Sequence, residues 1–241
     1  MMSISAAYAY NFDPTVVTEI YHFREQLYTA GTVQDYKKAV HDFIEDMEQR
    51  HLPEQEQHTV KNIAAVELVN FVDDGMDKKE RYLMLNERQY ECDRYMKQQT
   101  DVSEWFLVSY ADVKSRLVSY ISGGTAYTIS MDAYSLYQAA LKINKKFAYG
   151  YVGYALWLFF APPIAGGGYD AARKTYAKAL QYAANDFDRY VALIYRSQVY
   201  YAIGKKKEYE TDLTQARALY TEERLTEYVR KKNEAGMSFF D

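Results

Sequence analysis

Three short stretches with the same pattern recur at a fixed distance in the C-terminal half of the chain. They carry the pairs Ala140-Leu141, Ala179-Leu180 and Ala218-Leu219, each 39 residues after the one before. A fixed period in this range is typical of helical units that stack on one another, because one unit cannot bury its hydrophobic face alone. The repeat therefore predicts an all-α fold built from antiparallel helix pairs.

The residues around these pairs follow the 3.6-residue period of a helix. The shared face consists of Ala133, Tyr137, Ala140 and Leu141 in the first unit, Ala172, Tyr176, Ala179 and Leu180 in the second, and Thr211, Gln215, Ala218 and Leu219 in the third, where the match is weaker. Small residues on such a face let a neighbouring helix approach closely, and the aromatic ring fills the space beside them. We expect these faces to be buried between helices.

Helical patterns and helix-ending residues divide the rest of the chain. Helices are predicted near 15–30, 33–51, 55–73, 77–99, 103–121, 147–160, 186–203 and 222–233, and Ser130 or Asp132 is expected to cap the helix that leads to Ala140. The chain has only 4 prolines and 11 glycines, which agrees with an all-α fold because both residues destabilise helix interiors.

These elements predict four segments. They are an N-terminal segment 1–12, either a signal-peptide remnant or disordered, irregular helical pairs at 13–100, regular repeats at 101–221, and a capping helix with its tail at 222–241. The apolar end GMSFFD is expected to fold back onto the cap.

The composition excludes several classes of protein. The net charge of −4, from 29 basic and 33 acidic residues, provides no positive surplus for binding nucleic acid. The single cysteine, Cys92, can form neither a disulfide within the chain nor a cysteine cluster for a metal. The longest apolar run, YALWLFF, is too short to span a bilayer. We expect a globular protein without a nucleic-acid partner or an integral membrane span.

The small–aromatic–small spacing, followed by a helix break, resembles the second helix of a tetratricopeptide repeat (TPR). The resemblance covers roughly residues 114–220 and, more loosely, the whole chain, and ALKINKKFAYGYVGYA matches best. The chain departs from that family at Lys145, where proline is usual, and in its period of 39 residues instead of about 34. Sel1-like repeats, a longer-period relative, therefore remain an alternative. The resemblance implies a right-handed superhelix, a TPR-like solenoid, that binds a protein partner.

A narrower resemblance concerns the run from Pro163 to Gly168, which precedes a helix with an Ala-Leu pair. It is similar to the T component associated with TRAP-type periplasmic transporters, a bacterial family that is exported, helical and bound to a solute receptor. Ala7-Tyr8-Ala9 also fits the A-x-A cleavage pattern of a signal peptide, which predicts a periplasmic location. A cytoplasmic protein with a frayed N-terminus is the alternative.

No catalytic or metal-binding motif stands out in the sequence. Gly166, Gly167 and Gly168 precede a helix, but a nucleotide loop needs G-x-x-x-x-G-K-[ST] after a strand, so we expect a structural corner. His41 and Glu45 could share a helix face, although two ligands do not hold zinc. We expect no metal, no cofactor and no catalysis. An enzyme whose residues meet only in space stays a second alternative.

The chain contains 26 tyrosines, which suit a binding surface because they combine apolar area with a polar tip. If helices 147–160 and 186–203 line a concave groove, the binding residues are Tyr149, Leu156, Phe159, Phe160, Tyr195, Gln198 and Tyr201. We expect a scaffold that binds a protein or peptide in this groove. The first alternative is an exported transport component that binds an apolar small ligand or a solute receptor, and a homo-oligomer is compatible with both.

Overall fold

The computed structural model describes residues 10–29, 33–71, 76–220 and 224–240. These residues form eleven α-helices and two short 3₁₀ helices, and none of them lies in a strand. The predicted all-α class is confirmed. The chain divides into two compact units, one of Met1–Leu27 and Thr32–Lys145, the other of Tyr28–Gly31 and Lys146–Asp241. The division after Lys145 lies inside the stretch 101–221 that was expected to hold the regular repeats.

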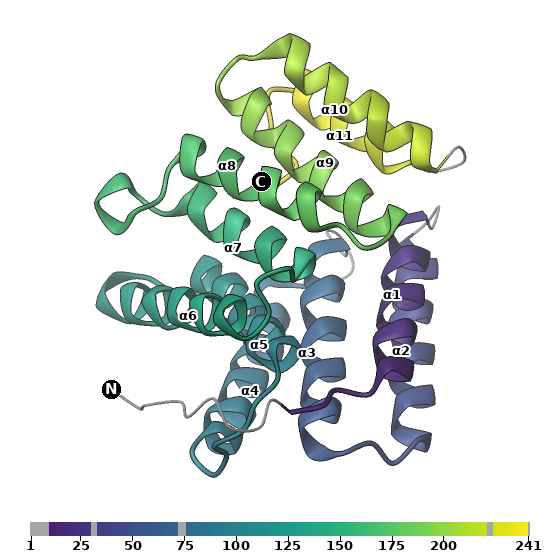
Figure 1. Cartoon of the computed structure of the whole chain (residues 1–241), viewed down its shortest axis with the longest axis vertical. Helices are drawn as coiled ribbons and strands as arrows, with labels where there is room; N and C mark the ends of the chain where they lie inside the picture. The colour runs from purple at the N-terminus through teal and green to yellow at the C-terminus, as the bar shows by residue number, and fades with distance from the viewer. Residues whose placement is uncertain (1–9, 30–32, 72–75, 221–223, 241) are drawn as a thin grey trace. The chain divides into compact units, whose positions relative to one another are not determined.

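The first unit is built around α5. Its elements are α1 (Pro14–Thr29), α2 (Val33–Gln49), α3 (Glu54–Phe71), α4 (Lys78–Met96), α5 (Glu104–Leu117), the 3₁₀ helix η1 (Val118–Tyr120) and α6 (Gly123–Ile143) (Figure 1). Helix α5 packs against α3, α4 and α6, and ten of its 14 residues are buried. The predicted ranges for α1 to α4 agree with these bounds to within three residues.

Helix α6 begins earlier than the sequence suggested. Ser122 is its N-cap residue, so Ser130 and Asp132 lie inside the helix and neither caps it. The Asp132 carboxylate instead accepts a hydrogen bond from Lys114 Nζ of α5 at 3.3 Å. This pairing explains why a residue with the chemistry of a cap is found within a helix.

The first unit buries polar groups that are paired with each other. Arg24 of α1 and Glu67 of α3 form an ion pair of 2.6 Å, with both side chains buried. Cys92 Sγ is buried against the Asn62 side chain, and burial raises the pKa of the Cys92 thiol, which keeps it protonated and unreactive. Buried polar groups need such partners, since an unpaired one is costly.

Part of the predicted N-terminal segment packs onto this unit. The ring of Phe12 stacks on Trp105 with centroids 6.0 Å apart, and the Tyr10 hydroxyl donates to Glu56 at 3.3 Å. The predicted cleavage pattern at Ala7 to Ala9 lies outside the described residues.

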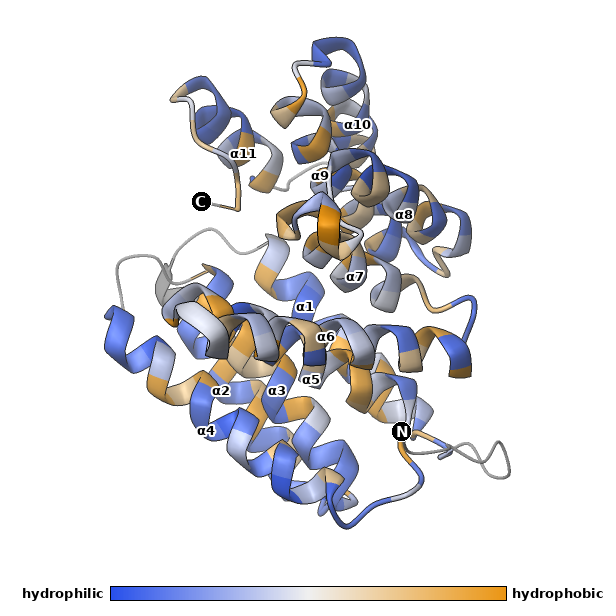
Figure 2. Ribbon diagram, turned by 90° about the vertical axis from the view of Figure 1, so that its left-hand side faces the viewer, coloured by the Kyte–Doolittle hydropathy of each residue, from blue (hydrophilic) through white to orange (hydrophobic). Residues whose placement is uncertain are grey.

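The second unit contains two helix pairs and a final helix. Its elements are α7 (Ala148–Phe160), the 3₁₀ helix η2 (Pro163–Ala165), α8 (Tyr169–Tyr182), α9 (Asp186–Ala202), α10 (Lys206–Leu219) and α11 (Leu225–Glu234). Each of α7 to α10 packs against the next one along the chain, and α7 also packs against α9 (Figure 1). No helix among the described residues is long and apolar enough to cross a membrane. Most of the helices carry both hydrophilic and hydrophobic residues (Figure 2).

The predicted repeat register is correct for two units and wrong for the third. Helices α6 and α8 bury three of the four expected residues each, Ala133, Tyr137 and Ala140, and Ala172, Tyr176 and Ala179, while Leu141 and Leu180 are half-buried. Helix α10 buries Tyr209, Leu213 and Ala216, whereas Ala218, Thr211 and Gln215 are exposed. The step from α8 to α10 is therefore 37 residues, because the connections on either side of α9 are shorter than those on either side of α7, while α9 itself is longer than α7.

The glycine-rich connection after α7 is a structural corner, as predicted. Gly168 N–H donates to the carbonyl of Leu158 at 2.8 Å, Gly167 N–H to Pro162 at 3.2 Å, and Gly166 N–H to Pro163 at 2.9 Å. An anion site needs free backbone donors, and these three are already used by the corner itself. Asp170, in the first turn of α8, pairs with Arg173 and Lys174.

Replacement of Gly167 by alanine tests the corner. A Cβ at this position would overlap the carbonyl oxygen of Ala161 and lie 2.5 Å from its Cβ, so backbone must move. We expect Gly167→Ala to lower the free energy of unfolding by about 1–3 kcal/mol in urea titrations followed by circular dichroism. The control is Gly124→Ala in α6, where a Cβ meets nothing within 4 Å. Equal stability of the two variants would contradict the close approach.

Candidate partner-binding site

Most of the predicted binding residues lie on neighbouring parts of α7 and α9. Phe159 and Phe160 end α7, and Tyr195, Gln198 and Tyr201 follow one face of α9 at spacings of three residues. The two helices pack against each other within the second unit. They therefore bring five of the seven predicted residues to one region of the structure.

The last residues of the chain return to this region. Helix α11 ends in a Schellman turn, in which Gly236 has a φ of 81° and Met237 N–H donates to the carbonyl of Lys232 at 3.0 Å. The left-handed conformation reverses the chain, so that residues 237–240, which we name the C-terminal segment, run back beside α9 (Figure 1). The predicted return of the tail onto the cap is confirmed, and the segment also reaches α7 and α9.

Two side-chain amides hold the backbone of the C-terminal segment. Asn233 Nδ2 donates to the Met237 carbonyl at 2.9 Å, and Phe239 N–H donates to Gln198 Oε1 at 2.9 Å. The two amides also bond each other, with Asn233 Nδ2 to Gln198 Oε1 at 3.0 Å and Gln198 Nε2 to Asn233 Oδ1 at 3.2 Å. Because both side chains are buried, their orientation is fixed by these bonds.

An aromatic cluster surrounds the two phenylalanines of the segment. The ring of Phe240 lies 5.3 Å from Phe159, 6.0 Å from Phe160 and 5.1 Å from Tyr195, between centroids. The ring of Phe239 contacts Tyr195 at 5.9 Å and Tyr228 at 6.4 Å. We name this set, with Tyr169 against Phe159 at 5.1 Å, the aromatic cluster. Edge-to-face and tilted contacts of this kind are favourable beyond the area that they bury.

The predicted residues differ in how far solvent reaches them. Phe160 is 59% exposed, and Leu156, Phe159 and Tyr201 are half-buried. Tyr195 and Gln198 are buried at 5% and 0% exposure, and Tyr149 is buried with its ring 5.8 Å from that of Phe147. A partner could therefore touch Phe160 directly, but it could reach Tyr195 and Gln198 only if the covering groups moved. The assignment of the seven residues to partner binding stays a prediction.

Sequence reasoning missed several residues of this region. Asn233 and Tyr228 lie on a helix that was predicted only as a cap, and Tyr169, which follows the glycine corner, was not predicted as a binding residue. The consecutive aromatics Phe239 and Phe240 were the available signal, because two adjacent phenylalanines that follow a polar helix need a hydrophobic surface to cover them.

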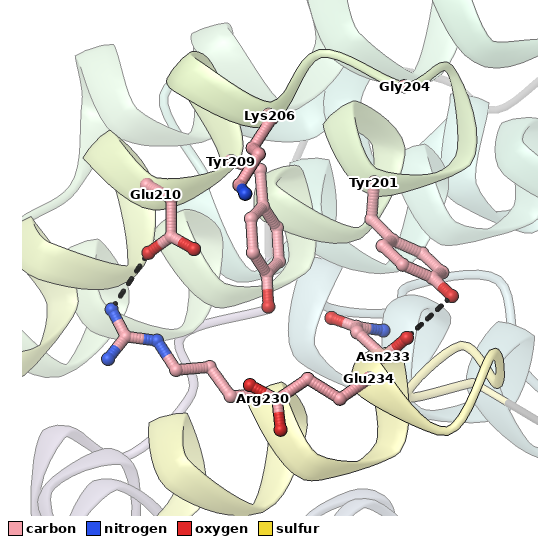
Figure 3. A pocket seen from close by; sticks show the side chains of 8 residues that line it. All are labelled: Tyr201, Gly204, Lys206, Tyr209, Glu210, Arg230, Asn233 and Glu234. Atoms are coloured by element: carbon pink, nitrogen blue, oxygen red, sulfur yellow. Dashed lines mark hydrogen bonds and ion pairs between the residues drawn. The ribbon is translucent and has the colours of Figure 1, made fainter.

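A separate pocket of about 350 Å³ lies between the end of α9, α10 and α11 (Figure 3). Its lining consists of Tyr201, Gly204, Lys206, Tyr209, Glu210, Arg230, Asn233 and Glu234. The Tyr201 hydroxyl donates to the Asn233 carbonyl at 2.9 Å, and Arg230 donates to Glu210 at 3.0 Å across the opposite side.

The chemistry of this pocket is polar and ionic. Burial and then the charge of Glu210 raise the pKa of Tyr209 to about 12, so its phenol is protonated at neutral pH and can only donate or accept hydrogen bonds. The lining groups carry both signs of charge, which suits a small polar ligand better than an apolar one.

His41 and Glu45 share a face of α2, as their spacing suggested. His41 Nδ1 lies 3.8 Å from the Glu45 carboxylate, and both side chains are mostly exposed. Among the described residues, no group of three or more His, Cys, Asp or Glu side chains is placed to hold a metal ion.

Comparisons with known proteins identify a similar fold but assign the chain to no family. No protein-family model matches the chain, and no curated protein matches it. The structure is similar to the crystal structure of a thermophilic TPR protein from Thermus thermophilus, with a TM-score of 0.57 and 12% sequence identity. That match covers 91% of this chain and 99% of the other. The chain therefore has a TPR-like fold, as its sequence resemblance predicted.

Alanine substitutions at two of the predicted binding residues compare the stability contribution of a buried side chain with that of an exposed one. We expect Tyr195→Ala to lower the free energy of unfolding by about 3–5 kcal/mol, because a buried aromatic is removed. Phe160→Ala should cost less than about 1 kcal/mol, because most of that ring is in solvent. Both values come from urea titrations. A Tyr195→Ala variant as stable as the wild type would show that Tyr195 is not part of the core.

Proposed function

We propose that this chain is a protein-interaction scaffold without catalytic activity, and that its second unit binds an extended segment of a partner protein. The binding surface consists of the C-terminal parts of α7 and α9, the first turn of α8, and the residues of α11 that contact the C-terminal segment, Tyr228 and Asn233. Stacked helices present such a surface in a fixed shape, which lowers the entropy cost of binding.

One observation carries the proposal: exposed aromatic side chains gather around this surface. Phe160, Tyr169 and Tyr228 are 59%, 45% and 41% exposed, although each contacts the aromatic cluster. Aromatic residues dominate the energetics of protein interfaces, and a group of them in solvent marks an interaction site more often than a structural one.

The alternatives have less support. The pocket in Figure 3 is lined by charged and polar groups, which disfavours an apolar small ligand. Burial and a raised thiol pKa disfavour an enzyme that uses Cys92 as its nucleophile. Export and association with a transporter stay predictions that rest on the sequence pattern at Ala7 to Ala9 and at Pro163 to Gly168.

Selection of peptides from a random display library tests the proposed surface. We expect selected peptides to bind the wild-type chain and to lose at least tenfold in affinity on Phe160→Ala or Tyr169→Ala, measured by fluorescence anisotropy. The matched controls are Tyr90→Ala and Tyr127→Ala, which remove exposed tyrosines of the first unit and should leave affinity unchanged.

Peptides whose affinity depends on Tyr90 or Tyr127, and not on Phe160 or Tyr169, would move the binding surface to the first unit. A library that yields no binder to the folded chain would argue against a peptide-binding scaffold altogether.

A further inference from the structure

We propose that the C-terminal segment is an intramolecular stand-in for the partner, and that the partner segment carries two consecutive aromatic side chains and displaces it. This inference rests on the proposed function, because it concerns the same surface. It identifies the chemistry of the partner and explains why the surface is occupied in the absence of one.

The first support is the way the segment is held. The surface contacts its backbone at two points, the Met237 carbonyl and the Phe239 N–H, through Asn233 and Gln198. Every peptide has these backbone groups except at proline, so the two amides do not depend on the sequence of the bound segment. They are donors and acceptors placed for any extended chain that follows the same path.

The second support is the position of the side chains. Phe240 inserts among Phe159, Phe160 and Tyr195, and Phe239 lies between Tyr195 and Tyr228. The rings of these two adjacent residues contact each other at 5.8 Å and share one apolar surface. A segment with one aromatic residue would fill only part of this surface, whereas two adjacent aromatics fill it as the C-terminal segment does.

The third support is that the segment covers its surface incompletely. Met237 is 46% exposed, and Ser238, Phe239 and Phe240 are half-buried. Phe160, Tyr169 and Tyr228 keep large exposed areas beside the bound segment. A longer partner segment can cover this remaining area, which gives it an advantage over the four residues that lie there now.

Exchange between the two occupants is energetically reasonable. The segment is joined to α11 by a single turn at Gly236, so its effective concentration at the surface is in the millimolar range. An intrinsic dissociation constant about tenfold below this concentration keeps the segment bound about nine-tenths of the time and weakens the apparent affinity of a competing peptide about tenfold. A separate segment with micromolar intrinsic affinity still displaces it at concentrations of tens of micromolar.

Without an occupant, the surface would be exposed to water. Gln198 and Asn233 would lose the bonds to the Met237 carbonyl and the Phe239 N–H, and the apolar faces of Phe159 and Tyr195 would be uncovered. Exposed apolar patches of this kind favour aggregation. A weakly bound segment of the same chain protects the surface and is still displaced easily.

The test uses the full chain with Phe239→Ala and Phe240→Ala together, and a labelled peptide with the sequence AGMSFFD, which corresponds to residues 235–241. The variant keeps the surface but removes the side chains that occupy it. We expect the peptide to bind this variant at least tenfold more tightly than it binds the wild type, measured by fluorescence anisotropy.

The control peptide AGMSAAD should not bind either protein. Adding Gln198→Ala to the variant should weaken peptide binding at least tenfold, because the Phe239 N–H loses its acceptor.

Three results would overturn the inference. One is equal binding of AGMSFFD to the wild type and to the double variant. The second is no binding by a double variant whose circular dichroism matches the wild type. The third is a wild-type dimer in sedimentation experiments that becomes monomeric in the double variant, which would assign the surface to a second copy of this chain.

A second measurement does not depend on the stability of the variant. Hydrogen exchange of the Phe239 amide in the wild type is expected to become faster when a library-selected peptide binds, because the amide is released from Gln198. If selected peptides bind and depend on Phe160 while Phe239 exchange stays unchanged, the inference fails but the proposed function stands. If no selected peptide depends on Phe160 or Tyr169, the proposed function itself fails.

Discussion

The close approach of neighbouring helices at small residues is the constraint on which the second unit depends. Ala172 and Ala179 of α8 and Ala216 of α10 are completely buried at the contacts with the adjacent helices. A methyl group allows backbones to come together, and the larger Tyr176 and Leu213 fill the space beside them. This packing sets the separation of α7 and α9, and so decides that Phe159 and Tyr195 can both contact one inserted ring.

The surface between these helices combines two kinds of interaction that have different roles. The paired amides of Gln198 and Asn233 must be satisfied because they are buried, and they impose a backbone direction on whatever is bound. The aromatic rings supply apolar contact area and tolerate small changes of position. Together they favour an extended segment over a compact ligand. The ionic pocket on the other side of Asn233 lacks the aromatic cluster and would select a different, polar ligand.

Part of this site could be read from the sequence, and part could not. Phe159, Phe160, Tyr195, Gln198 and Tyr201 were predicted to share a surface on the assumption that helices 147–160 and 186–203 line one groove, and they lie on α7 and α9, which pack against each other. Their exposure was not foreseen, because periodicity tells which residues share a face and not what covers that face. Tyr149 shares the helix with Phe159 but packs on Phe147, since it lies three turns away at the other end of α7.

The sequence by itself determined the local structure: the helices, the corner after α7 and the small residues at which α6 and α8 pack. These follow from the preferences of short stretches of backbone and from the 3.6-residue period, which need no distant partner. The tertiary structure decided the rest. It moved the third buried alanine from Ala218 to Ala216, began α6 at Gly123, and returned Phe239 and Phe240 to α9. Each of these depends on contacts between residues far apart in the chain, whose energies no local pattern contains.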